Sequence, residues 1–264
     1  MMLKIMKRMR AFLALVIWPA AMVGALWPVV AAPASATAGL TAEQIIERLD
    51  ANQYLSSVHM VSRLIINSGR RVLEKEMECW AIGSEKALVV FHNPADKGTK
   101  YLKLGNELWM YFPDAADLVK ISGHMLRQGM MGSDISYQEA LESEKLGELY
   151  RFELLGEEIY DGVKCFVLEA RALPGKNVAY ASRKIWVDAE RFVGLKEELY
   201  AASGKLMKVS RVEELLRQGG RYYPKRVVME DQLKKGSSTV LIVDSIEFNI
   251  KIPDEMFTLR SLMR

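Results

Sequence analysis

The residue types that most often perform chemistry are few and scattered in this sequence. Its three histidines, His59, His92 and His124, lie in separate segments and lack the short spacing of a metal site. His124 precedes Ser133 and Asp134 in one stretch, and such a trio could in principle hydrolyse a lipid ester. Trios of this kind often occur by chance, and no pattern predicts an oxyanion hole beside this one. We therefore expect polar residues in a loop rather than a catalytic site.

The sequence also lacks the motifs that usually mark catalytic, metal and nucleotide sites. It contains no G-x-S-x-G elbow, no H-E-x-x-H and no paired C-x-x-C. The run Ser203-Gly204-Lys205 resembles the end of a phosphate-binding loop, but it lacks the earlier glycine and the following Ser or Thr. This run is more typical of a hairpin turn. We expect no enzymatic activity, no metal and no cofactor.

Methionines give the strongest local signal for binding. Met125, Met130 and Met131 gather near Leu126 in a stretch punctuated by three glycines, just before a short helix predicted over Tyr137–Leu141. Methionine is flexible and polarizable, so it suits surfaces that accept variable apolar partners such as acyl chains. Ordinary core packing explains the cluster equally well. The glycines favour binding, because they would let the segment move over a cavity.

One helix and a long series of strands are predicted around this stretch. Thr41 and Gln44 form a capping-box pattern at the start of a helix that should end near Leu55. Runs rich in Val, Ile, Leu and aromatic residues follow, divided by short turn pairs, at 57–67, 70–82 and 86–92. In the second half, turn pairs recur every 13–16 residues, which leaves room for one long strand each. This spacing predicts an antiparallel meander.

Several of the predicted strands carry apolar groups on both faces. Examples are LWMYF at 108–112, KIWVD at 184–188 and VLIV at 240–243. A sheet with one face in water would alternate cleanly between apolar and polar residues. We therefore predict a mainly β (α+β) fold in which a curved sheet wraps around side chains, a helix or a ligand. Part of its outer face should also be covered.

The first 36 residues have the pattern of an export signal. They carry four basic residues and no acidic one, followed by an apolar run over 11–32 and small residues that suit cleavage after Ala36 or Ala38. An uncleaved membrane anchor is the alternative, because the run approaches spanning length. Two prolines interrupt the run, however, and favour cleavage. We expect residues 37–264 to be a single exported, soluble domain in the periplasm.

The rest of the chain is nearly balanced in charge. Its 32 basic and 33 acidic residues contrast with the net +3 of the whole sequence. A nucleic-acid-binding domain is usually basic in itself, so this balance argues against such a function. Two cysteines, Cys79 and Cys165, lie in apolar stretches and are either a disulfide or two buried thiols, and the sequence leaves both alternatives open.

Five segments carry a resemblance to a known family. They are LWMYFP at 108–113, KISGHMLR at 120–127, MGSD at 131–134, VMED at 228–231 and IPDEMFTL at 252–259. With the signal, the first helix and the meander, these segments resemble the LolA-like branch of bacterial outer membrane lipoprotein-sorting proteins. The resemblance extends over essentially the whole mature chain.

The resemblance implies a half-open antiparallel β-barrel of about eleven strands, lidded by short helices and holding acyl chains inside. It also implies a monomeric periplasmic carrier. Such a carrier would receive lipoproteins from an inner-membrane transporter, of the ABC or resistance-nodulation-division type, and pass them to an outer-membrane acceptor. The mature chain is longer than the archetypal carrier. Members of this branch are often encoded near transporters of the resistance-nodulation-division type, so the cargo could instead be a lipid.

Eight residues are the candidates for binding acyl chains. Leu108, Met110 and Phe112 would form one barrel face, while the lid or mouth would contain Met125, Leu126, Arg127, Met130 and Met131. Arg127 would either close the lid by bonding across the mouth or remain a solvated surface residue. The alternative function is an envelope-stress sensor or accessory lipid-binding protein acting with an anti-sigma factor or a transporter. Such sensors usually carry a further C-terminal domain.

Overall fold

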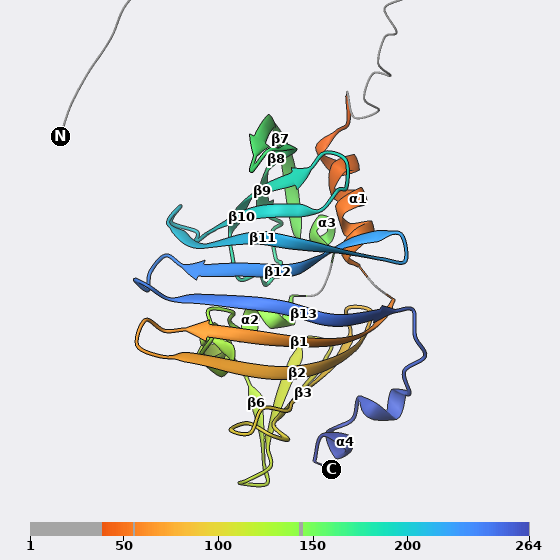
Figure 1. Cartoon of the computed structure of the whole chain (residues 1–264), viewed down its shortest axis with the longest axis vertical. Helices are drawn as coiled ribbons and strands as arrows, with labels where there is room; N and C mark the ends of the chain where they lie inside the picture. The colour runs from red at the N-terminus through yellow and green to blue at the C-terminus, as the bar shows by residue number, and fades with distance from the viewer. Residues whose placement is uncertain (1–38, 55, 143–144, 264) are drawn as a thin grey trace, which may run out of the picture. The chain divides into compact units, whose positions relative to one another are not determined.

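One antiparallel sheet contains all thirteen strands of the described chain (Figure 1). The computed structural model describes residues 39–54, 56–142 and 145–263. The strands are β1 (Ser57–Asn67), β2 (Val72–Ile82), β3 (Lys86–Phe91), β4 (Lys100–Leu104), β5 (Glu107–Phe112), β6 (Asp117–Ile121), β7 (Tyr150–Tyr160), β8 (Val163–Ala172), β9 (Ser182–Asp188), β10 (Gly194–Tyr200), β11 (Leu206–Gln218), β12 (Arg221–Asp231) and β13 (Ser238–Phe248). Strands that follow one another in sequence also pair, except β6 and β7, which form the two edges of the sheet. In addition, β1 pairs with β13.

The first helix, α1 (Ala42–Gln53), begins where the capping pattern predicts. The Gln44 N–H donates to the Thr41 hydroxyl at 3.3 Å, and the Gln44 side chain accepts from the Thr41 N–H at 3.0 Å. Ile45, Ile46 and Leu49 are buried against a cluster that contains strands β7, β8 and β9. The helix therefore covers the second half of the sheet, and we call the face it covers the inner face.

The segment between the two edge strands has to cross the inner face. Because β6 and β7 are consecutive in sequence but lie at opposite edges, residues 122–149 connect them across the sheet. We call these residues the crossover segment; residues 143 and 144 are outside the described part. Its short helices are η1 (Gly123–Arg127), η2 (Met130–Gly132), α2 (Tyr137–Leu141) and α3 (Leu146–Leu149).

The C-terminal residues cover part of the opposite, outer face. They form η3 (Asp254–Met256) and α4 (Leu259–Leu262), and the buried Ile252, Phe257 and Leu262 pack against Leu88 and Leu102. Trp109 and Tyr111 of β5 also contact this cluster, whereas Leu108 and Met110 of the same strand belong to an inner cluster. This second layer accounts for strands that are apolar on both faces.

The predicted mainly β, half-open architecture is confirmed, with thirteen strands rather than about eleven. The sheet does not close, because β6 and β7 do not pair with each other. The additional strands lie in the first half, where turns at 92–99, 105–106 and 113–116 divide the chain into the short strands β3 to β6. No helix in the described part is long and apolar enough to cross a membrane. The predicted export signal and its cleavage sites fall within residues 1–38, outside the described residues.

The two cysteines are both free thiols in this structure. Cys79 lies on β2 and Cys165 on β8, and six other strands separate these two in the sheet. A disulfide needs Cα atoms within about 7 Å of each other. The free-thiol alternative therefore describes the folded protein.

Candidate functional site

A cavity of about 480 Å³ lies on the inner face, between α1, the crossover segment and the middle strands. This volume falls within the range of about 300–1,000 Å³ that is usual for small-molecule sites. Apolar and charged residues both line the cavity. The apolar ones include Val58, Ala81, Leu195, Val212, Val227 and Leu241, and the charged ones are Asp50, Glu142, Lys145, Arg183, Lys196 and Glu197.

Arg183 of β9 is the most buried cation of this lining. Its Nη2 donates to Glu142 Oε2 at 2.9 Å, and its Nη1 lies 3.7 Å from Glu197 Oε2. The guanidinium also lies over the Tyr150 ring, 4.6 Å from the centroid. Burial would lower the pKa of Arg183, but the neighbouring acidic groups outweigh it and raise the pKa above its ordinary value. Its Nε has no hydrogen-bond partner among the described residues.

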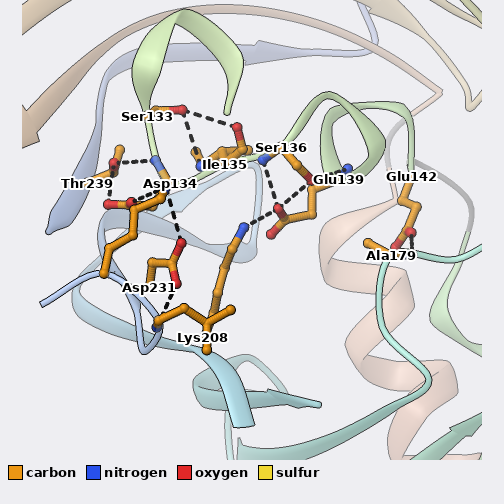
Figure 2. Close-up of polar contacts among 12 residues, drawn as sticks. Ser133, Asp134, Ile135, Ser136, Glu139, Glu142, Ala179, Lys208, Asp231 and Thr239 are labelled. Atoms are coloured by element: carbon orange, nitrogen blue, oxygen red, sulfur yellow. Dashed lines mark hydrogen bonds and ion pairs between the residues drawn. The ribbon is translucent and has the colours of Figure 1, made fainter. Parts of the chain in front are cut away.

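Three carboxylates of the crossover segment, one buried and two largely buried, attach it to the second half of the sheet, and Figure 2 shows their contacts. The first, Asp134, is 2 % exposed. Its carboxylate accepts from the Ser237 hydroxyl at 2.7 Å and from the Thr239 hydroxyl at 3.1 Å, while its N–H donates to the Thr239 hydroxyl at 2.8 Å. The Lys234 Nζ lies 3.4 Å from the Asp134 Oδ1. Asp134 therefore binds the crossover segment to β13 and to the turn before it.

The other two carboxylates lie at the two ends of α2. Glu139 caps its start by accepting from the N–H and the hydroxyl of Ser136, at 2.8 and 2.6 Å, and it also accepts from Lys208 of β11. Glu142 follows the end of α2 and accepts from the Ala179 N–H and from Arg183. Each carboxylate thus pairs with a different part of the second half (Figure 2).

Toward the first half of the sheet, the crossover segment makes mainly apolar contacts. Met125, Leu126, Met130 and Met131 pack against a cluster of buried residues from β1 to β6 and from α2. This cluster comprises Leu64, Ile66, Met77, Phe91, Tyr101, Leu108, Met110, Ile121 and Tyr137. The Tyr101 and Tyr137 hydroxyls are hydrogen-bonded at 3.1 Å. We call this set the inner apolar cluster.

The structure brings together seven of the eight residues predicted to bind acyl chains. Leu108 and Met110 are buried in the inner apolar cluster, and the five others packed against it are Phe112, Met125, Leu126, Met130 and Met131. None of them is among the described residues that line the cavity. Leu241 of β13 lies between the two regions, because it lines the cavity and packs against the cluster.

Arg127, the eighth candidate, is exposed on η1 and makes no hydrogen bond or ion pair with another described residue. Its closing role stays a prediction. His124 is likewise exposed, whereas Ser133 is buried and its hydroxyl bonds to the backbone of Ile135. The described residues therefore do not assemble a Ser–His–Asp site.

The residues that line the cavity were missed because they carry no local motif. They come from α1, the crossover segment and seven strands that are far apart in the sequence. The charges of Arg183 and Glu197 gave no clear signal, because each lies next to other charged residues, in RK at 183–184 and KEE at 196–198.

Comparisons with known proteins identify the family and the fold. A family model described as "Uncharacterized protein" matches residues 83–264, which is more than half of the chain. Comparison with curated proteins finds no match.

Three solved structures are similar over most of the chain. A DUF1329 family protein from Desulfovibrio piger has a TM-score of 0.76 and 24% identity, covering 83% of this chain and 96% of that one. An outer membrane lipoprotein-sorting protein domain from Vibrio parahaemolyticus has a TM-score of 0.74 and 23% identity, covering 84% and 97%. A LolA superfamily protein from Nitrosomonas europaea has a TM-score of 0.69 and 26% identity, covering 84% and 99%. The chain therefore belongs to the family of the matching model and has the LolA-like fold of outer membrane lipoprotein-sorting protein domains.

Proposed function

We propose that the protein is a non-catalytic periplasmic carrier that binds the acyl chains of lipoproteins or lipids. It receives them from an inner-membrane transporter and passes them to an outer-membrane acceptor. The observation that carries this proposal is the cavity on the inner face of an unclosed sheet, covered by the crossover segment. The similarity to lipoprotein-sorting and LolA superfamily structures supports it.

The energetics of an acyl chain explain why a carrier needs such a site. Each exposed methylene costs about 0.8 kcal/mol in water, so a chain that crosses an aqueous compartment has to be covered. The cavity offers an apolar wall that includes Val227 and Leu241, and Leu241 also lies at the boundary of the inner apolar cluster. Movement of the crossover segment away from that cluster would join the two into a longer apolar groove.

The charged part of the lining favours an amphiphile over a pure hydrocarbon. Arg183, Glu142 and Glu197 already satisfy much of one another's charge, which leaves Lys145, an exposed cation of the lining, to meet a polar head group. Buried polar groups orient a ligand, while the apolar wall supplies most of its affinity. The ligand therefore has a polar group next to its acyl chain.

Two neighbouring residues on β13 provide a matched test. Leu241 pairs with Leu64 and Val227 on the inner face, whereas Ile242 pairs with Arg63 and Arg226. Successive residues of a strand point to opposite faces. Leu241→Glu therefore places a carboxylate in the cavity, and Ile242→Glu places one between two arginines outside it.

The assay is titration of a fluorescent fatty acid into delipidated protein. We expect saturable binding by the wild-type protein, at least tenfold weaker binding by Leu241→Glu and unchanged binding by Ile242→Glu. Circular dichroism would check that both variants fold. Equal binding by the two variants, or no binding by the wild-type protein, would contradict the proposal.

A further inference from the structure

Three neighbouring turns at one end of the sheet form a basic surface with exposed apolar tips. They are residues 68–71 between β1 and β2, 232–237 between β12 and β13, and 201–205 between β10 and β11. These hairpins are adjacent because the strand order places β2, β1, β13, β12, β11 and β10 side by side. In Figure 1 they lie together at the left end of the sheet.

The three turns carry five basic residues and no acidic one. The basic residues are Arg70, Arg71, Lys205, Lys234 and Lys235, and we call them the basic rim. Lys234 pairs with Asp231 and Asp134. The other four are exposed and have no carboxylate partner among the described residues. Adjacent hairpins are about 10 Å apart, close to one Debye length at physiological salt, so their fields add.

Exposed aliphatic side chains accompany this charge. Val72, at the start of β2, is 65 % exposed, and Leu233, in the turn before β13, is 48 % exposed. They are two of the five large apolar side chains that are most exposed in the described chain. Each lies within two residues of unpaired cations of the basic rim.

The geometry points to an anionic lipid bilayer surface as the partner of the basic rim. Cations spread over separate turns suit a surface of many mobile negative charges, and aliphatic tips between them can enter the interfacial region. A stable protein partner would instead require a continuous interface of about 800 Å² on this side, with an apolar core. Two isolated aliphatic tips do not provide such a core.

The basic rim is also connected to the crossover segment. Asp134 accepts from Ser237 and lies 3.4 Å from Lys234, both of which belong to the turn between β12 and β13. A bilayer that attracts Lys234 would compete with Asp134 for this cation. Docking at the membrane, where lipid would be exchanged, would therefore weaken the attachment through Asp134, one of the three that hold the crossover segment.

The test is flotation of the exported full chain with vesicles of phosphatidylcholine alone or mixed with an equal part of phosphatidylglycerol. We expect binding only to the anionic vesicles, with loss at high salt. The double variant Arg70→Ser/Arg71→Ser should bind about 25-fold more weakly, since each basic residue near such a surface contributes about fivefold. The matched control, Lys251→Ser/Arg260→Ser, removes two exposed cations elsewhere and should bind as the wild type does.

Two further measurements separate this inference from the proposed carrier function. Leu241→Glu, which blocks the cavity, should still float with the anionic vesicles, because the basic rim is intact. Loss of flotation in that variant would overturn the inference, since the cavity would then account for vesicle binding. Equal weakening by both double variants, or no preference for phosphatidylglycerol, would also overturn it.

Discussion

The buried ion pair between Arg183 and Glu142 predicts that its two halves differ in their effect on stability. Glu142→Gln removes one negative charge but leaves Arg183 next to Glu197, at 3.7 Å. Arg183→Met removes the cation and leaves both carboxylates without it. The two positions are similarly buried, with side chains 11 % and 9 % exposed, so burial alone predicts similar effects.

The expected magnitudes follow from the charges that remain. A glutamine at 142 can still accept from the Ala179 N–H and from Arg183. Glu142→Gln should therefore lower the free energy of unfolding by about 1–1.5 kcal/mol, which is the difference between a charged and a neutral hydrogen bond. Removing one partner of a buried ion pair typically lowers the free energy of unfolding by about 3–5 kcal/mol. Arg183→Met should lie near the lower limit, because the adjoining cavity gives the remaining carboxylates room to relax. For a domain of this size, that is a decrease in Tm of roughly 6–12 °C for Arg183→Met against roughly 2–6 °C for Glu142→Gln.

Thermal and urea unfolding at pH 7 and pH 5 would measure both effects. In Arg183→Met, the two carboxylates that lose this cation should have raised folded-state pKa values, so this variant should regain stability as the pH falls. Glu142→Gln should show no such recovery. A cost for Arg183→Met equal to or below that of Glu142→Gln, or the same cost at both pH values, would refute this reasoning.

Three other predictions concern single groups. Burial raises the pKa of Asp96, but hydrogen bonds, chiefly from Lys75, outweigh it and lower the pKa below 3.8. Asp96→Asn should therefore be less stable than the wild type at pH 7 by about 1–2 kcal/mol, and in urea titrations this difference should shrink progressively as the pH falls from about 4 toward the lowered pKa of Asp96. Burial raises the pKa of the Cys79 thiol to about 12, so iodoacetamide should label Cys79 at pH 8 only in denaturant, as mass spectrometry would show. Tyr137→Phe breaks the 3.1 Å bond to Tyr101 and should cost about 1–2 kcal/mol, whereas an unchanged urea midpoint would show that this bond contributes nothing.

Local signals predicted the elements of the fold well. The Thr41 capping box marks the start of α1, and the turn pairs of the second half separate the strands from β7 to β13. The pairing of β1 with β13 has no local signal, because it joins residues about 180 positions apart. That pairing places β6 and β7 at opposite edges and forces the crossover segment over the inner face. The sequence alone could not show this route.

The candidate site was predictable in its apolar part and not in its polar part. Met125, Met130 and Met131 gather with Leu108 and Met110 because apolar side chains near one another in sequence tend to share a cluster. The attachments of Asp134, Glu139 and Glu142 join residues that are 37–105 positions apart and depend on the register of β9, β11 and β13. Charge alone does not reveal which partner such a carboxylate will meet.

The most direct test of the carrier function is the identity of what the protein holds after export. The chain would be expressed with its own signal, purified from periplasm without detergent, and examined by native mass spectrometry and solvent extraction. We expect a bound acylated peptide or lipid that delipidation removes and that returns on incubation with lipoprotein or lipid vesicles. A ligand-free mass, with no uptake from either source, would contradict the carrier function.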